Sequence, residues 1–166
     1  MDDQRVLVTG GAGFIGGALV DSLRGEADIR VLDIDPDPNP PSDIEVIEGD
    51  IRDPDTVTAA MDGVDTVFHQ AALVSVADSV DRPMASHTIN ATGTLEVLEA
   101  AREHDARVVV ASSAAVYGDP DDVPVTESAS LDPTSPYGVD KLAIDHYTRL
   151  YHELYGLETV TLRYFN

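Results

Sequence analysis

Three side chains, Ser113, Tyr137 and Lys141, have the chemical types and the spacing that proton transfer at a substrate hydroxyl requires. Tyr137 and Lys141 are four residues apart in a helical pattern, so both point to one face of the helix. A free tyrosine has a pKa of about 10 and acts as a base at neutral pH only beside positive charge, which the Lys141 ammonium would supply. Ser113 closes a predicted strand and would hydrogen-bond the same substrate oxygen. The sequence therefore predicts a catalytic Ser-Tyr-Lys triad.

Lys141 is also the only lysine of the chain, because nine of its ten basic residues are arginine. The spacing of a tyrosine and a lysine four residues apart recurs by chance on surface helices, and that is the alternative interpretation. A chain that otherwise uses arginine nevertheless places its single lysine four residues after this tyrosine, which favours catalysis.

The elements that must position these side chains alternate between strand and helix. Short β-branched runs predict strands at 5–9, 29–33, 44–47, 64–69, 107–112 and 159–163. Start and stop signals predict helices at 14–24, 54–61, 83–104 and 135–155, the last with Ser135 as its N-cap and Pro136 in its first turn. Nearly continuous apolar strands are typical of a sheet covered on both faces. The predicted fold is α/β, a doubly wound parallel sheet of the Rossmann type in three α/β/α layers.

A glycine-rich turn follows the first predicted strand, with glycines at 10, 13 and 16 before the first helix. Glycine adopts the backbone angles of such a turn, and the helix N-terminus offers amides and positive potential to a phosphate. Asp33 ends the second strand, where a carboxylate can bind ribose hydroxyls. Together they predict dinucleotide binding, whereas a simple tight turn leaves Asp33 unexplained. Asp33 and Asp35, with no arginine between positions 34 and 38, favour NAD over NADP.

Composition excludes several classes of function. The net charge of −21 would repel phosphate backbones and anionic membranes, so neither nucleic acid nor membrane is an expected partner. The absence of cysteine excludes disulfides and thiolate chemistry. No apolar run reaches the roughly 18 residues of a membrane span and no signal peptide is recognisable, so we expect a cytoplasmic protein. Acidic residues spread along the whole chain suggest a halophilic source as a hypothesis.

Two further features have a structural interpretation that we prefer to a functional one. His69 ends a predicted strand beside the cofactor site, where a hydrogen-bonded structural histidine is more common than an acid or base. Asp119, Asp121 and Asp122 lie close together in a polar, proline-rich loop at 118–134. In so acidic a chain we interpret them as solvated charge, and no metal site is predicted.

The order of several motifs resembles the extended short-chain dehydrogenase/reductases of the NAD-dependent epimerase/dehydratase family, whose glycine pattern is G-x-x-G-x-x-G. Gly49-Asp50-Ile51-Arg52 resembles the segment whose aspartate meets the adenine, and His69-Gln70-Ala71-Ala72 resembles the H-x-A-A segment along the cofactor. Asn90 resembles the asparagine that braces the active site. Ser112 to Gly118 resembles S-S-x-x-V-Y-G, which makes Ser113 the catalytic serine.

Leu162-Arg163-Tyr164-Phe165-Asn166 resembles the L-R-Y-F-N segment of these enzymes, where the phenylalanine region borders the nicotinamide and the asparagine touches substrate phosphate. The resemblance thus covers nearly the whole chain. It implies the cofactor contacts Gly10, Gly13, Phe14, Ile15, Gly16, Asp33, Asp50, Ile51, Ala71, Ala72, Asn90, Ser112, Tyr137, Lys141 and Phe165. It implies the substrate contacts Ser113, Tyr137 and Asn166.

The resemblance implies a nucleotide-sugar 4-epimerase with NAD as cofactor. Tyr137 would remove the proton of the sugar 4-hydroxyl while hydride passes to NAD, and the ketone would then be reduced on its other face. Ala114 and Ala115 stand where dehydratases of the family have an Asp-Glu pair, which disfavours dehydration. Dehydrogenase, reductase and decarboxylase activities stay open, as does a homodimer.

Chain length is the main departure from the family, because extended members continue to roughly twice 166 residues with a smaller domain that holds the nucleotide-sugar. We therefore expect residues 1–166 to form an NAD-binding Rossmann domain that stops before the substrate-binding domain, which would be absent. The alternative is a module that binds NAD without turnover. The presence of Ser113, Tyr137 and Lys141 argues for descent from an enzyme.

Overall fold

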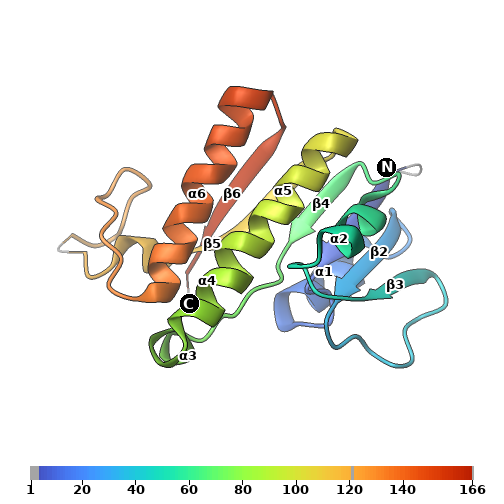
Figure 1. Ribbon diagram of the computed structural model, residues 1–166, viewed down its shortest axis with the longest axis horizontal. Helices are drawn as coiled ribbons and strands as arrows, with labels where there is room; N and C mark the ends of the chain where they lie inside the picture. The colour runs from blue at the N-terminus through green and yellow to red at the C-terminus, as the bar shows by residue number, and fades with distance from the viewer. Residues whose placement is uncertain (1–3, 121, 166) are drawn as a thin grey trace.

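A computed structural model describes residues 4–120 and 122–165 of the chain, shown in Figure 1. Its strands are β1 (Arg5–Thr9), β2 (Asp28–Asp33), β3 (Ile44–Glu48), β4 (Thr66–His69), β5 (Arg107–Ser113) and β6 (Thr159–Tyr164). Its α-helices are α1 (Phe14–Leu23), α2 (Pro54–Met61), α3 (Val76–Asp81), α4 (Pro83–His87), α5 (Gly93–His104) and α6 (Pro136–Tyr155). A π-helical turn, η1, spans Thr88–Thr92, and a 3₁₀ helix, η2, spans Ala114–Tyr117.

The strands form one parallel sheet in the order β3-β2-β1-β4-β5-β6. This is the order of the Rossmann fold, in which the chain crosses from β3 over the sheet to β4 and then continues outward in the other direction. Sequence predicted all six strands and the parallel sheet, and both predictions are confirmed. The bounds of β1 are as predicted, and those of the other strands differ by at most two residues, because the ends of elements fray.

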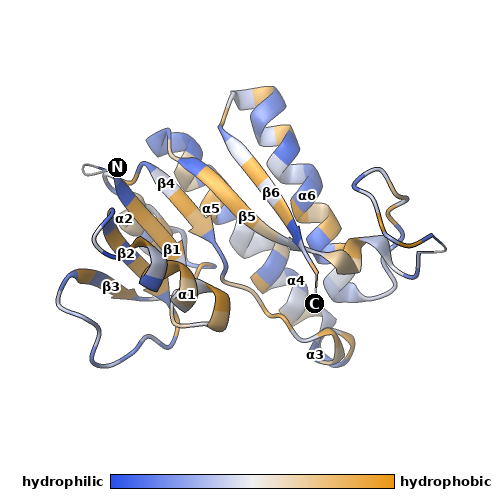
Figure 2. Cartoon of the chain, turned by 180° about the vertical axis from the view of Figure 1, so that it is seen from behind, coloured by the Kyte–Doolittle hydropathy of each residue, from blue (hydrophilic) through white to orange (hydrophobic). Residues whose placement is uncertain are grey.

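Side chains of the central strands alternate between two cores, one on each face of the sheet. Leu7 is fully buried in the larger core, which α2, α5 and α6 cover, whereas Val6 and Val8 belong to the smaller core, which includes Val20 of α1. Figure 2 shows that the face of α1 leaves β4, β5 and β6 in view. The expected three layers are present, and in the described part of the chain the third layer consists of α1, over β1 and β2.

The predicted helix at 83–104 has the correct bounds but is not uniform. It consists of α4, the π-helical turn η1 and α5 in direct succession. A π turn fits one extra residue into a helix, and such turns often occur at functional sites. Helix α3 was not predicted, since it has only six residues. Its one side-chain cap is Ser75, whose Oγ accepts a hydrogen bond from the Asp78 amide at 3.1 Å.

Helix α6 begins and ends where the sequence predicts. Ser135 accepts a hydrogen bond from the Gly138 amide at 3.1 Å, and Pro136 occupies the first turn. Gly156 ends the helix with a left-handed φ of 75°, a conformation that favours glycine. Both ends of the helix that carries Tyr137 and Lys141 are therefore set by local sequence.

We expect the unfolding temperature to rise as KCl increases from about 0.1 M to molar levels, where the Debye length falls to about 3 Å. Screening has two opposite effects. It weakens the ion pairs that all nine arginines form with carboxylates, among them Arg5 with Asp28 at 2.7 Å, and it also weakens the repulsion among the carboxylates. Exposed pairs contribute only about 0.2–1 kcal/mol each, whereas the net charge of −21 repels itself throughout the domain. Circular dichroism melting curves at several KCl concentrations measure the effect, with a globular protein of near-zero net charge as control. A flat or falling unfolding temperature would argue against the halophile hypothesis.

Membrane-spanning helices and metal-binding clusters are two features to consider in the residues that the structure describes. None of their helices is long and apolar enough to cross a membrane. Within residues 4–120 and 122–165, no group of three or more His, Asp or Glu side chains is arranged to hold a metal ion.

Candidate active site

The predicted site residues gather at the carboxyl edge of the sheet, around the crossover between β1 and β4. The glycine-rich turn follows β1, Asp33 ends β2, the segment from Gln70 follows β4, and Ser113 ends β5. In an open α/β sheet this crossover forms the crevice where ligands bind. Four separate segments of the sequence thus meet where a dinucleotide is expected.

The glycine-rich turn is packed so closely that side chains do not fit at two of its positions. A Cβ at Gly16 would lie 2.1 Å from the carbonyl oxygen of Gly10. Gly10 has a φ of +70°, and a Cβ there would lie 2.7 Å from the Ala71 nitrogen. Glycine is therefore required for the turn to approach β4 and for α1 to start at this point.

The N-terminus of α1 has no side-chain cap, because its N-cap residue is Gly13. The first amides of a helix have no partner within the helix and carry partial positive charge. Phe14, the first residue of α1, has a side chain that is 96% exposed, and Ile15 is also exposed. The turn therefore presents backbone donors to an anion, beside two apolar side chains.

Asp33 lies at the end of β2 next to this turn. Its Oδ2 accepts a hydrogen bond from the Ala12 amide at 2.9 Å, and its Oδ1 accepts one from the Asp35 amide at 3.0 Å. These bonds hold the carboxylate in one orientation while each oxygen keeps a second lone pair. Asp33 can therefore accept hydrogen bonds from a diol such as ribose.

Asp50 and Arg52 line a hollow of about 460 Å³ together with Asp53, Thr88 and Thr92. The Arg52 guanidinium hydrogen-bonds both carboxylate oxygens of Asp50 and holds the pKa of Asp50 below its usual value. Ile51 is buried in the larger core, so only its backbone is free to meet a ligand. The hollow thus lies after β3 at Asp50, the residue that the family resemblance places next to the adenine.

His69 is a buried structural residue, as the sequence interpretation holds. Thr94 donates its hydroxyl hydrogen to the Asn90 carbonyl and therefore accepts from His69 Nε2 at 2.9 Å. The Thr9 hydroxyl then donates to His69 Nδ1 at 2.7 Å. Burial, and after it the charge of Lys141, lowers the pKa of His69 to about 3. Both ring nitrogens are occupied and the ring is neutral, so His69 has no proton to exchange with a ligand.

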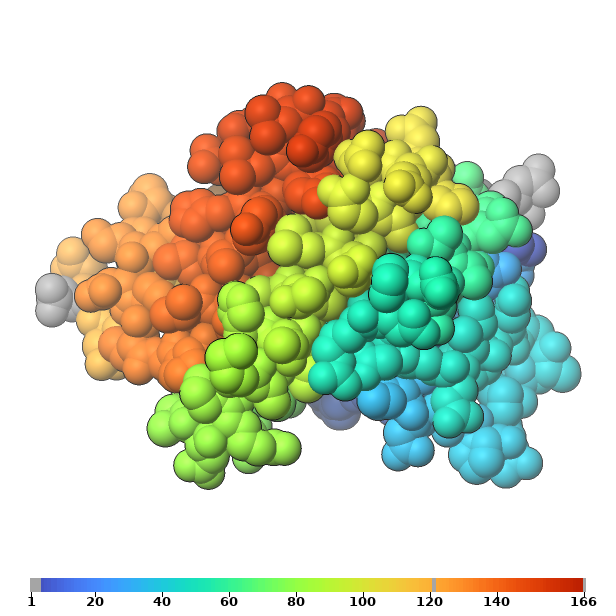
Figure 3. Space-filling view, viewed as in Figure 1, coloured from blue at the N-terminus to red at the C-terminus, as the bar shows by residue number. Residues whose placement is uncertain are grey.

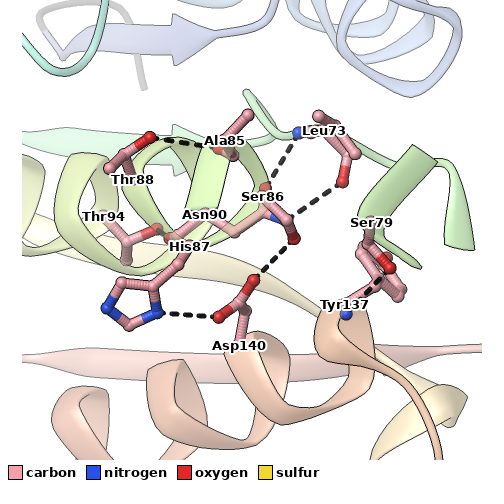
Figure 4. A network of polar contacts seen from close by, with 10 residues as sticks. All are labelled: Leu73, Ser79, Ala85, Ser86, His87, Thr88, Asn90, Thr94, Tyr137 and Asp140. Carbon is pink, nitrogen blue, oxygen red and sulfur yellow. Dashed lines mark hydrogen bonds and ion pairs between the residues drawn. The ribbon is translucent and has the colours of Figure 1, made fainter. Parts of the chain in front are cut away.

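Asn90 lies within the π-helical turn and is fully buried. Its side chain accepts from the Leu73 amide at 2.8 Å and donates to the Leu73 carbonyl at 3.0 Å, as Figure 4 shows. It therefore braces the segment after β4, which contains Ala71 and Ala72. The side-chain amide of Asn90 bonds to Leu73 and Ser86, and its contact with the cofactor stays a prediction.

Lys141 and Tyr137 lie side by side on α6, with the lysine nitrogen 5.7 Å from the centre of the tyrosine ring. The Lys141 ammonium is buried and donates to the Ala111 carbonyl in β5 at 2.7 Å. Burial lowers the pKa of Lys141 to about 8, although Asp145 and Asp140 act in the opposite direction. Lys141 is thus anchored to the strand that ends in Ser113, and it remains mostly charged at neutral pH.

Ser113 caps the 3₁₀ helix η2, because its Oγ accepts from the Ala115 amide at 3.1 Å. Its hydroxyl hydrogen is not used by that bond and is free to donate. Ser112 is buried, and its Oγ has no partner among the described residues. Such an orphaned polar group is unusual in a folded protein and is common at functional sites.

Phe165 is 60% exposed, and its ring lies 6.0 Å from that of Tyr117. Asn166, the predicted substrate contact, lies outside the described residues. A larger hollow of about 750 Å³ lies between α6, β6 and the loop that follows Gly118; its lining includes Tyr117, Asp145, Arg163 and Phe165. No residue of the glycine-rich turn lines this hollow, whereas Phe165, a predicted cofactor contact, does.

Sequence reasoning missed several residues that position the site. Ser79 of α3 accepts from the Tyr137 amide at 3.1 Å, and Asp140 on α6 hydrogen-bonds Ser86 and His87 of α4 (Figure 4). These pairs are more than fifty residues apart in sequence. The one local signal was an aspartate at a position between Tyr137 and Lys141, on a face that the helical pattern assigns to the interior.

Comparison with known proteins gives consistent matches. A family model described as the NAD dependent epimerase/dehydratase family matches residues 6–166. A putative UDP-glucose 4-epimerase of Methanocaldococcus jannaschii is 42% identical over 97% of this chain and 55% of the relative. A UDP-glucose 4-epimerase of Brucella ovis in complex with NAD has a TM-score of 0.93 at 36% identity, covering 98% of this chain and 52% of that one.

A UDP-N-acetylglucosamine 4-epimerase of Methanobrevibacter ruminantium, in complex with UDP-N-acetylmuramic acid, also has a TM-score of 0.93 at 36% identity. The match covers the whole of this chain and 56% of that enzyme. The chain thus spans about half the length of the relatives that it matches. The family expected from the sequence motifs is confirmed: the chain belongs to the NAD-dependent epimerase/dehydratase family.

Proposed function

We propose that this chain binds NAD at the carboxyl edge of its sheet and forms the cofactor-binding part of a nucleotide-sugar 4-epimerase. The observation that carries the proposal is the buried Lys141 ammonium, which is fixed to β5 beside Tyr137. The names of the relatives, UDP-glucose 4-epimerase among them, support this choice within the family. Ser113, Tyr137 and Lys141 are the proposed catalytic residues.

The residues at the sheet edge fit a dinucleotide. The uncapped amides at the start of α1 suit a pyrophosphate, since a helix N-terminus combines free donors with favourable potential. The oriented carboxylate of Asp33 suits the ribose hydroxyls, and the hollow at Asp50 suits a planar base. The remaining cofactor contacts proposed from the family resemblance, including Ala71, Ala72 and Phe165, border the same edge.

The chain's own side chains divide the chemistry between them. Tyr137 accepts the proton of the sugar hydroxyl and returns it when the carbonyl is reduced again. The Lys141 ammonium stabilises the phenolate form that this role requires. Ser113 donates its hydrogen to the same sugar oxygen and so fixes its position. When bound, NAD supplies the hydride acceptor and donor.

The proposed reaction is epimerisation and not dehydration, because Ala114 and Ala115 follow Ser113 in η2. Their methyl groups cannot donate a proton to a leaving hydroxyl. A dehydrogenase, reductase or decarboxylase would use the same three residues, so a substrate assay must distinguish these activities.

We expect NAD to bind at least about tenfold more tightly than NADP, a difference of about 1.4 kcal/mol. Asp33 would accept from both ribose hydroxyls of NAD, whereas a 2′-phosphate would meet its negative charge and that of nearby Asp35. Calorimetric titration of the chain with both oxidised cofactors measures the ratio, and Asp33→Asn, which removes the charge, should narrow it. Tighter binding of NADP would overturn the assignment of Asp33.

We further propose that residues 1–166 bind NAD without epimerising a sugar by themselves. The ketone must be held while it turns, and that requires a grip on the nucleotide that we assign to a separate substrate-binding part. The relatives, about twice as long as this chain, have room for such a part. A second copy of the chain is a proposed partner, because Leu150 and Leu154 leave apolar side chains exposed on α6, and sedimentation distinguishes the monomer from the dimer.

The function is tested with a coupled assay that follows conversion of UDP-galactose to UDP-glucose. The assay is run on the 166-residue chain and on a chimera in which the second half of a UDP-glucose 4-epimerase relative follows it, with NAD binding measured in parallel. We expect NAD binding by both proteins and turnover by the chimera alone. Turnover by the short chain would contradict the need for a second part, and absence of NAD binding would contradict the proposal as a whole.

A further inference from the structure

Asp140 is a buried carboxylate that the proposed chemistry does not use. It lies on α6 between Tyr137 and Lys141, and its side chain is only 6% exposed. The Ser86 hydroxyl donates to its Oδ2 at 2.6 Å, and the His87 Nδ1 donates to its Oδ1 at 2.9 Å (Figure 4). Aspartate is rarely buried unless it is paired, so such a site has a specific structural reason.

The hydrogen bonds of Asp140 connect α6 to the rest of the active site. Ser86 accepts from the Asn90 side chain at 3.3 Å, and Asn90 in turn holds both backbone groups of Leu73. Figure 3 shows the start of α6 in surface contact with the segment that contains α3 and α4. A continuous chain of hydrogen bonds therefore runs from α6 through the π-helical turn to the segment after β4.

The charge of Asp140 also acts on Lys141. The groups that face the lysine from its surroundings are Tyr137 and Asp145 on α6, neutral His69 on β4 and the Ala111 carbonyl on β5. Asp145 is partly neutralised, because Arg163 of β6 donates to it at 2.7 Å. Asp140 has no arginine partner among the described residues; its hydrogen-bond donors are a hydroxyl and an exposed imidazole.

We propose that Asp140 is a positioning residue that locks the first two turns of α6 against α4 and favours the charged form of Lys141. The proposal rests on the proposed function, in which Tyr137 needs the lysine ammonium beside it. The carboxylate sets where both side chains lie without touching substrate or cofactor. The same group thus supplies a mechanical restraint and an electrostatic one.

Two substitutions separate these effects. Asp140→Asn keeps the shape and both hydrogen bonds, because its oxygen accepts from Ser86 and its amide donates to His87, whose exposed ring can change tautomer. It removes only the charge. Asp140→Leu has a similar shape and removes both bonds. Glu153→Gln is the matched control, since it removes one negative charge from the same helix about 18 Å from Lys141 along the axis.

The chain allows a direct measurement, because Lys141 is its only lysine. Protein made with isotopically labelled lysine gives one side-chain NMR signal, and its titration gives the pKa of Lys141. We expect a value of about 8 for the wild type, because burial lowers the pKa. We expect Asp140→Asn to lower this pKa by about 0.5 unit or more. The shift is smaller than the 1 to 3 units of a directly facing charge, because adjacent residues on a helix do not face each other. Equal pKa values in Asp140→Asn and Glu153→Gln would overturn the electrostatic part.

NAD affinity tests the mechanical part. We expect Asp140→Leu to weaken NAD binding about tenfold or more and Asp140→Asn to restore it to within about threefold of the wild type. Wild-type affinity in a folded Asp140→Leu protein would overturn the positioning role. If that variant does not fold, the lysine titration of Asp140→Asn still decides the charge effect. A wild-type chain that fails to bind NAD would refute the proposed function, yet the titration would still report the coupling of Asp140 to Lys141.

Discussion

Replacing Tyr137 with phenylalanine is expected to lower turnover by about 10² to 10⁴ fold, the range that a positioned acid or base contributes. The affinity for NAD should change by less than about twofold. The substitution removes only the phenolic hydroxyl group, and the backbone amide at position 137 still donates its hydrogen bond to Ser79. Steady-state kinetics of the chimera described above measure the loss of turnover, and calorimetry measures the affinity for NAD.

Tyr147→Phe is the matched control for this prediction. Tyr147 lies on the same helix but is exposed to solvent, so its hydroxyl should contribute to neither measurement. Near-native turnover by Tyr137→Phe would show that another group is the base. A loss of NAD affinity equal to the loss of turnover would show that the tyrosine holds the cofactor and does not transfer the proton.

The substitution Gly16→Ala is expected to weaken NAD binding by at least about 100 fold and to cost about 1–3 kcal/mol of stability. Its Cβ would lie 2.1 Å from the Gly10 carbonyl oxygen and 2.9 Å from the Gly11 Cα. Both are backbone atoms, so the turn itself must move and the amides at the start of α1 lose their arrangement. Calorimetric titration and thermal unfolding measure the two effects.

The neighbouring substitution Gly17→Ala provides the control. The nearest atom to a Cβ at Gly17 is the Gly11 carbonyl oxygen at 3.5 Å, an ordinary contact. Alanine is also the better helix former by up to about 1 kcal/mol. Gly17→Ala should therefore bind NAD normally and be at least as stable as the wild type. Equal affinities for Gly16→Ala and Gly17→Ala would contradict the role assigned to the turn.

Local signals in the sequence predicted most of the fold. The glycine-rich turn, the Ser135 cap and the apolar strands each depend on neighbouring residues, so their positions follow from short segments of sequence. The parallel sheet follows from the alternation of strands and helices, since a crossover between parallel strands requires a connecting element. Sequence also predicted that Tyr137 and Lys141 share a face, because that depends only on helix periodicity.

The residues that sequence could not predict act through contacts between distant segments. The bond of Ser86 to Asp140 and the bond of Thr9 to His69 join residues that are 54 and 60 positions apart. Nothing in a short window specifies such a partner. The π-helical turn at Asn90 was missed for the same reason, because its extra residue is stabilised by tertiary hydrogen bonds and leaves the helical pattern on either side unchanged.

The doubly wound sheet that the sequence predicted is confirmed, and the amount of helix cover differs between its two faces. Apolar strands predicted cover on both faces, and within residues 4–120 and 122–165 the helix on the second face is α1, over β1 and β2 (Figure 2). Residues of β6 such as Leu162 are exposed. Strand hydrophobicity reports that a face is suited to burial, but it does not identify the element that covers it.

Titration of the ¹⁵N-labelled 166-residue chain with NAD, followed by amide NMR, tests the central claim most directly. The claim is that the dinucleotide binds across the β1–β4 crossover. We predict saturable shifts at the amides of Gly10 to Gly16, Asp33, Asp50 to Arg52 and Ala71 to Leu73, with little change in the hollow lined by Asp145 and Arg149. Shifts confined to that hollow, or no saturable shift at millimolar NAD, would contradict the account.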